Sequence, residues 1–195
     1  MTPAAFLSLA LQTVTAPRDV ARLLLSIRPG SEALITAFAL VVVLNALVYG
    51  LSVVALGEGG MAALISAPLA FMALQALTLG LVIAMLSALG RALGGVARLE
   101  DVALLLIWLQ ALRVLAQLGI MVLMLVTPAL GSLAVLIVSA LGVWIAVHFV
   151  DEAHGLQNML KSVAVLVGSV LGMALAISVI LTALGVAPEG VVGNV

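Results

Sequence analysis

The sequence contains no cysteine among its 195 residues, and only 8% of its residues are charged. The absence of cysteine excludes disulfides, thiolate nucleophiles, iron–sulfur clusters and cysteine-ligated zinc. The formal net charge of -1 provides neither a basic surface for nucleic acid nor an acidic tail for a basic partner. Nucleic acid is therefore excluded as a partner before any motif is considered.

Catalytic and cofactor-binding signatures are also missing from the sequence. It contains no Walker-type phosphate loop, no dinucleotide-binding glycine fingerprint, no His-Glu-x-x-His and no Gly-x-Ser-x-Gly. Serine, histidine and aspartate occur, but no pattern places a nucleophile beside a base and an orienting group. The sequence predicts a protein that is not an enzyme and that uses no cofactor.

Apolar residues, in contrast, make up 66% of the chain, which is more than one water-soluble core of this size can bury. The surplus must face lipid, and a helix needs roughly 20 apolar residues to cross the bilayer. Proline and glycine divide the apolar sequence into five stretches of at least that length. We therefore expect an all-α, polytopic transmembrane bundle with five spans: about 33–56, a run over 61–89 that crosses from Pro68, two crossings within 102–150 divided at 127–131, and about 162–184.

A short amphipathic helix is expected after Pro17 and before the first span. Apolar residues recur there every three or four positions, with polar residues opposite them (Val20, Leu23, Leu24 and Ile27 against Arg18, Asp19, Arg22 and Ser26). Two placements are open: a seat in the membrane interface, or packing on the protein's own cytoplasmic face. The expected organisation is a cytoplasmic or interfacial segment 1–30, the five-span domain 31–187 and an exterior tail 188–195.

Basic residues outside the spans predict the orientation. If the chain crosses five times, all six fall on one side of the membrane and none on the other (Arg18, Arg22, Arg28, Arg91, Arg98 and Lys161). The positive-inside rule then places the N-terminus in the cytoplasm and the C-terminus outside.

Arg113 lies near the middle of the third span, where a charged side chain costs at least about 2.5–3.5 kcal/mol on insertion scales. We expect it to face the bundle interior. Gln110 and Gln117 share its helical face, and Asn45 and Gln75 lie at mid-depth on other spans. This intramembrane polar stripe fits structural hydrogen bonding, a contact to a partner's buried carboxylate or a lipid headgroup, or the path of a transported solute.

His148, Asp151 and His154 lie within one arc if the fourth helix continues past the membrane. Such side chains can bind zinc or transfer protons, although their spacing matches no recognised metal motif. The alternative is that they are ordinary polar residues at a wet helix end.

Two further features concern packing. Gly168 and Gly172 form a small-xxx-small pattern in the fifth span, which lets helices approach closely and favours packing within the monomer over a dimer seam. Trp108 and Trp144, toward the cytoplasmic ends of the third and fourth spans, are expected to act as interfacial anchors.

The chain resembles the Yip family of Ypt/Rab-GTPase-interacting membrane proteins, in particular bacterial proteins with a Yip-one-like domain. The resemblance rests on Thr-Ala-Pro-Arg at 15–18 before a short amphipathic helix, on five spans, and on Ala-His-Gly-Leu at 153–156 leading through Lys161 into the last span. It implies a helical membrane domain that acts through partners, and it transfers no functional residue.

The sequence thus favours a non-enzymatic interaction or assembly module that contacts membrane lipids and a membrane-protein partner or a second copy of itself. Arginine-dominated basic residues with abundant alanine, leucine, valine and glycine suit a GC-rich bacterial genome, and we therefore expect the bacterial inner membrane. The alternative is a small transporter or channel subunit whose polar path is lined by the third span. A mid-depth aqueous cavity favours the alternative, and a polar edge that faces lipid favours a partner.

Overall fold

The computed structural model describes residues 3–56 and 68–183, and within these ranges the protein is all-helical. The helices are α1 (Pro3–Thr15), α2 (Pro17–Ile27), α3 (Ser31–Leu56), α5 (Pro68–Ala92), α6 (Leu99–Val126), α7 (Pro128–His154) and α8 (Met159–Ala183). Five of them, α3 and α5 to α8, are long and apolar enough to cross a membrane, which confirms the predicted fold class. The part of the second apolar run before Pro68 and the predicted tail 188–195 lie outside the described residues.

Proline and glycine set the helix boundaries, as the sequence predicts. Pro17, Pro68 and Pro128 each open a helix, where the missing N–H of proline costs no hydrogen bond. Thr127 alone separates α6 from α7, in an extended conformation. Gly155 ends α7 in the left-handed conformation, with φ of 62°, which glycine adopts without steric cost.

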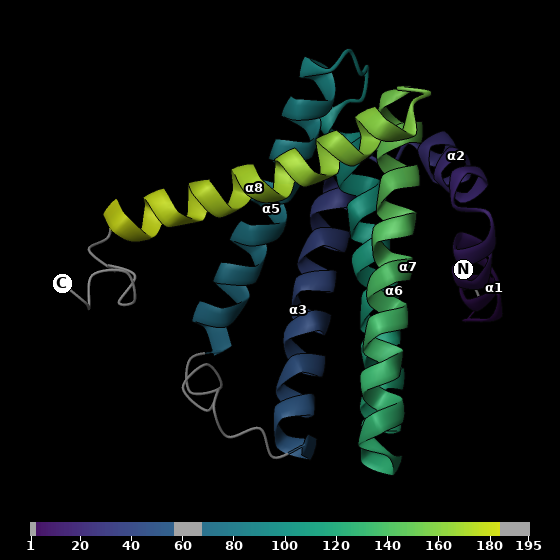
Figure 1. The fold of residues 1–195 in the computed structure, drawn as a ribbon, viewed down its shortest axis with the longest axis vertical. Helices are drawn as coiled ribbons and strands as arrows, with labels where there is room; N and C mark the ends of the chain where they lie inside the picture. The colour runs from purple at the N-terminus through teal and green to yellow at the C-terminus, as the bar shows by residue number, and fades with distance from the viewer. Residues whose placement is uncertain (1–2, 57–67, 184–195) are drawn as a thin grey trace.

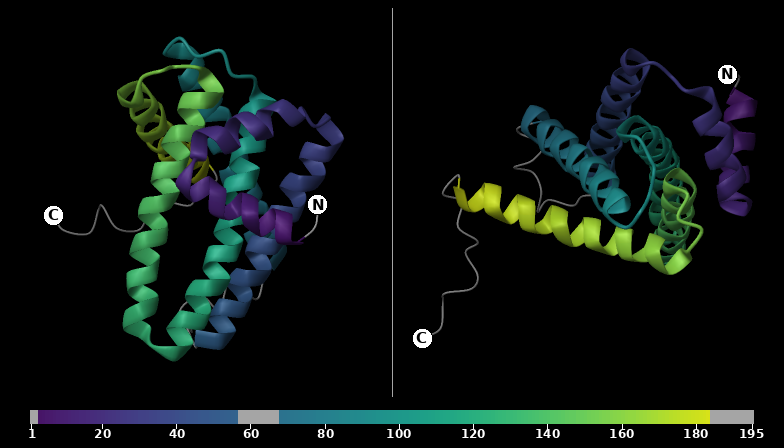
Figure 2. Two further views of the ribbon diagram at one scale, coloured as in Figure 1. Left: turned by 90° about the vertical axis from the view of Figure 1, so that its right-hand side faces the viewer. Right: turned by 90° about the horizontal axis from the view of Figure 1, so that it is seen from above.

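Figure 1 shows α3, α6 and α7 running side by side, with α5 inclined against them and α8 crossing α5 at a wide angle. The views in Figure 2 agree, and α8 packs on α5 and α7. One end of this bundle carries α2, the α5–α6 loop and the α7–α8 loop, and we call it the charged end because the six basic residues outside the spans lie there. The opposite end, at Thr127, is the hairpin end.

Two apolar cores lie toward the charged end. The larger core lies among the five long helices, α3, α5, α6, α7 and α8. It includes Leu86, Val102 and Val165, which are almost completely buried. The second lies between the N-terminal helices and the α6–α7 pair and includes Val20 and Phe149. The charged end is therefore the well-packed half of the bundle.

The N-terminal helices show what the sequence pattern did not resolve. The sequence pattern predicts no separate helix before Pro17, but α1 forms one and packs on α2 and α7. Helix α2 packs on α6 and α7 through Val20 and Ala21, both fully buried. The helix thus packs on the protein itself, and its seat in the membrane interface stays a prediction.

Candidate functional site

A set of ion pairs at the charged end joins α2 to the end of α7, and we call Arg18, Arg22, Asp151 and Glu152 the charged clamp. Arg18 Nη2 lies 2.8 Å from Asp151 Oδ2, and the Asp151 side chain is only 6% exposed. Asp151 Oδ1 also accepts hydrogen bonds from the Asn158 N–H (3.1 Å) and the Ser162 hydroxyl (3.0 Å). A buried carboxylate requires such compensation. Asp151 therefore links α2, α7 and the start of α8.

The second pair of the clamp is more exposed. Arg22 makes a two-pronged contact with Glu152, with Nε 2.8 Å from Oε1 and Nη2 3.2 Å from Oε2. The hydrogen bond and charge of the Glu152 carboxylate raise the pKa of the Arg22 guanidinium above its ordinary value. Because the pair is exposed on the arginine side, it adds orientation more than stability.

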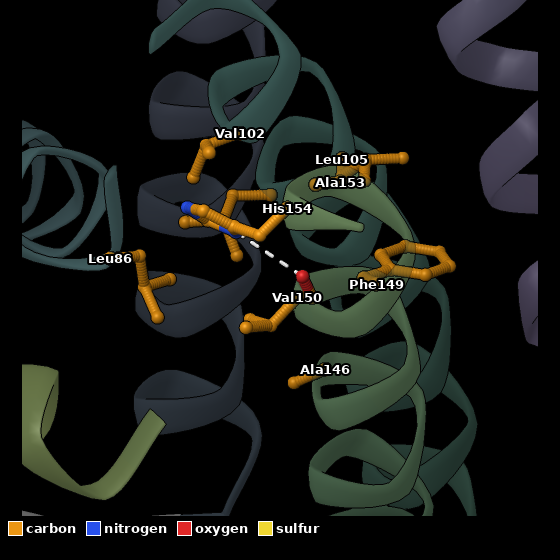
Figure 3. Close-up of a pocket in the computed structure, with 9 residues that line it drawn as sticks. Leu86, Val102, Leu105, Ala146, Phe149, Val150, Ala153 and His154 are labelled. Carbon is orange, nitrogen blue, oxygen red and sulfur yellow. Dashed lines mark hydrogen bonds between the residues drawn. The ribbon is translucent and has the colours of Figure 1, made fainter. Parts of the chain in front are cut away.

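His154, at the end of α7, is 1% exposed and packs against the α5–α6 loop. Its Nδ1 lies 3.2 Å from the Val150 carbonyl oxygen (Figure 3), and its own carbonyl accepts a hydrogen bond from the Val96 N–H. A Cβ on Gly90 or Gly95 would overlap the His154 side chain, so both positions need glycine. An apolar cavity of about 10 Å³ beside His154 has space for one water at most.

The three predicted metal candidates have separate environments. His148 Nδ1 lies 2.7 Å from the Trp144 carbonyl oxygen, and its ring packs on the Trp144 indole. Asp151 is engaged by Arg18, and His154 is enclosed by glycines. In the described part of the chain, no three histidine, aspartate or glutamate side chains are placed to hold a metal ion.

The polar stripe is divided in the structure. Arg113, expected to face the bundle interior, is exposed and lines an open groove of about 290 Å³ between α3, α6 and α7. Gln117 lines the same groove, whereas Gln110 is half-buried outside it. The groove also contains three polar side chains that the sequence did not nominate: Tyr49, Ser52 and Ser139. We call it the Arg113 groove.

The other two predicted members of the stripe lie apart from the groove. The buried Asn45 amide donates to the Val41 carbonyl of its own helix at 2.8 Å. The Gln75 side-chain oxygen is buried and accepts no hydrogen bond from the described residues. The antiparallel register of α6 and α7 about Thr127 was the signal that could have identified Ser139, since it places that residue near the level of Arg113.

The Arg113 groove occupies only the hairpin-end half of the bundle. Its lining runs from Arg113 to Leu56, Met124 and Val135, near the α6–α7 turn. Toward the charged end the space between the helices is filled by the larger apolar core. The groove therefore opens beside the helices and does not continue through the core.

Gly168 and Gly172 lie where α8 crosses α5. An added Cβ would lie 3.3 Å from the Leu89 Cδ1 at Gly168, and 3.3 Å from the Met85 Sδ at Gly172. These contacts are tight, so the two glycines bring α8 close to α5 within one chain.

Trp108 on α6 holds α1 in place. The sequence predicted Trp108 to be an interfacial anchor, but its side chain is buried beneath α1. Its indole N–H donates to the Thr13 hydroxyl oxygen at 3.1 Å, and the Phe6 ring meets the indole edge-on with centroids 5.2 Å apart. Thr13 itself is fully buried.

We expect Thr13→Val to loosen α1, because it leaves the buried indole N–H without an acceptor at a cost of about 1–2 kcal/mol. Amide hydrogen exchange across residues 3–15 should become about tenfold faster or more. Thr15→Val is the matched control, since the Thr15 hydroxyl is exposed and reaches only the Gln12 carbonyl at 3.4 Å. Equal exchange rates in the two variants would show that the bond does not hold α1.

An all-helical chain with five helices of membrane-spanning length and composition is a polytopic α-helical membrane protein. The family model of the Yip1 domain matches residues 11–185, so the chain belongs to the Yip1-domain family. The match runs from within α1 to the end of α8 and confirms the resemblance seen in the sequence. No curated protein and no solved structure matches the chain.

Proposed function

We propose that this Yip1-domain protein is a non-enzymatic interaction or assembly module of the bacterial inner membrane. The observation that carries the proposal is the environment of Arg113, a cation near the middle of a membrane-spanning helix. Its guanidinium takes part in none of the hydrogen bonds or ion pairs found among the described residues. An unpaired charge at this depth needs a counterpart, and the groove is open to one from outside the bundle.

The transporter or channel alternative requires a polar path through the bundle. The Arg113 groove supplies polar lining in only the hairpin-end half, and Leu86, Val102 and Val165 fill the other half. This supports a binding surface on the side of the bundle over a conducting path.

The proposed orientation has the charged end in the cytoplasm. The six basic residues outside the spans lie at that end, and the positive-inside rule assigns such an end to the cytoplasmic side. On this assignment the charged clamp fixes α2 on the cytoplasmic face, and the hairpin end lies outside.

Purification from native membranes in mild detergent, followed by native mass spectrometry, tests the proposed function. We expect the chain in a stoichiometric complex with another membrane protein, with bound lipids in addition. A lone monomer or homodimer would contradict it. Purified protein in liposomes should conduct no solutes, and a flux above that of empty liposomes would favour the transporter alternative.

A further inference from the structure

The geometry points to a specific kind of partner: we propose that the Arg113 groove binds a transmembrane helix of another protein through a membrane-embedded aspartate or glutamate. This inference rests on the proposed function and adds the chemistry of the contact. It follows from the depth of Arg113, the placement of the chain's own carboxylates and the shape of the groove.

Depth excludes a headgroup as the natural counterpart. Arg113 lies midway between Leu99 and Val126 on α6, so about 20 Å of helix separates it from either end. A lipid phosphate stays near the helix ends, which is further than the arginine side chain reaches. A partner that pairs with Arg113 must carry its anion at the same depth, and a transmembrane helix does so.

The carboxylates of the described spans do not reach this depth. In the described spans, acidic residues occur only in terminal turns (Glu32 on α3, Glu100 and Asp101 on α6, Asp151 and Glu152 on α7). These spans in a second copy of the chain would thus bring no counter-ion to Arg113. The guanidinium fork matches a carboxylate in a bidentate geometry, so a carboxylate on a transmembrane helix of another protein fits the groove.

The groove offers further donors and an open rim. The Tyr49 hydroxyl and the Gln117 amide line it and can donate to the carboxylate oxygens that Arg113 leaves free. On α7, Ser139 lines the groove and Gly142 follows one turn later, and nothing lies within 4 Å of a Cβ added at Gly142. Small residues at such a rim let another helix approach closely. The volume of about 290 Å³ has room for side chains from one face of that helix.

Site-specific photo-crosslinking in native membranes tests the contact, with the full-length chain carrying a photoreactive residue at Ser139. Leu136 is the control position, since it is 69% exposed on α7 and lies outside the groove lining. We expect the Ser139 position, and not the Leu136 position, to capture a protein whose crosslinked peptide is a transmembrane segment containing aspartate or glutamate.

The same photoreactive residue at Ser139 measures how strongly the contact with the partner depends on the charge of Arg113. Arg113→Gln should reduce the crosslink about tenfold or more, since one partner of a charge pair is removed, whereas Arg113→Lys should keep part of it. Lys161→Gln is the control for loss of a charge, because Lys161 is exposed at the start of α8. Gly142→Leu should also abolish the crosslink, because the leucine side chain fills the rim of the groove. This variant tests the proposed contact if Arg113→Gln fails to fold.

Crosslinks to a second copy of this chain, to lipid alone or to a segment without a carboxylate would overturn this inference, as would an Arg113→Gln yield equal to that of the unaltered chain. These failures leave the proposed function standing if a partner still co-purifies. Absence of any co-purifying protein would instead overturn both.

Discussion

Replacement of Asp151 by alanine is expected to lower the free energy of unfolding by about 2–4 kcal/mol. The Asp151 carboxylate accepts hydrogen bonds from Arg18, from the Asn158 N–H and from the Ser162 hydroxyl. The buried Ser162 hydroxyl then keeps only its longer bond to the Asn158 carbonyl oxygen at 3.2 Å, and the Asn158 N–H loses this acceptor. The Arg18 side chain is 44% exposed and returns to solvent, so its share of the loss is smaller.

Thermal unfolding in detergent measures this effect against a matched carboxylate. Glu100→Ala removes an acidic residue whose side chain is 51% exposed and pairs with Arg98 at 3.5 Å, so it should change stability by no more than about 0.5 kcal/mol. Asp151→Asn should fall between the two, since an amide oxygen in the place of Oδ1 can still accept both of its hydrogen bonds, whereas the amide nitrogen cannot accept from Arg18. If Asp151→Ala melts at the temperature of Glu100→Ala, the charged clamp does not hold the helices together.

Substitution of Gly90 by alanine should destabilise the protein by about 1–3 kcal/mol, although alanine is the better helix former. The added Cβ would overlap the imidazole of His154, which is buried at the end of α7 with a cavity of only about 10 Å³ beside it, too small to take the displaced ring. Gly80→Ala on the same helix is the control. Nothing lies within 4 Å of a Cβ at Gly80, so this change should stabilise α5 by roughly 0.5–1 kcal/mol.

A double-mutant cycle identifies His154 as the cause. The loss in Gly90→Ala combined with His154→Ala should be smaller than the sum of the two single losses, because the Cβ then enters the space that the ring vacates. Unfolding midpoints of the four chains give the coupling. Additive losses, or a Gly90→Ala variant as stable as Gly80→Ala, would contradict the proposed overlap.

Much of the fold could be predicted because apolar length and proline placement are local properties of the sequence. Pro68 and Pro128 begin α5 and α7, and Gly155 ends α7, where each residue's backbone preference requires it. Helix α1 was missed because an apolar stretch of 13 residues is too short for a span and carries little periodic polarity. Only its contact with Trp108, from a distant part of the chain, shows why it is helical.

The polar residues were harder to place. Their neighbours lie far away in the sequence or, for Arg113, no partner is found among the described residues. The placement of Arg18 stayed open between the membrane interface and the protein's own surface, since nothing in the sequence indicates that Asp151 lies beside it. The direction of Arg113 depends on how α3 and α7 pack around α6, which periodicity on one helix cannot specify. His154 was read as a possible ligand, and its close fit against Gly90 appears only when α5 and α7 are brought together.

The charged clamp also constrains the order in which the molecule is assembled. Arg18 and Asp151 are separated by 133 positions, so α2 emerges long before its partner on α7 exists. At about 5–20 residues per second, synthesis of the intervening chain takes roughly 7–27 s. Throughout that interval four spans must enter the membrane while α1 and α2 wait undocked. The first helices to be made are therefore among the last to reach their final position.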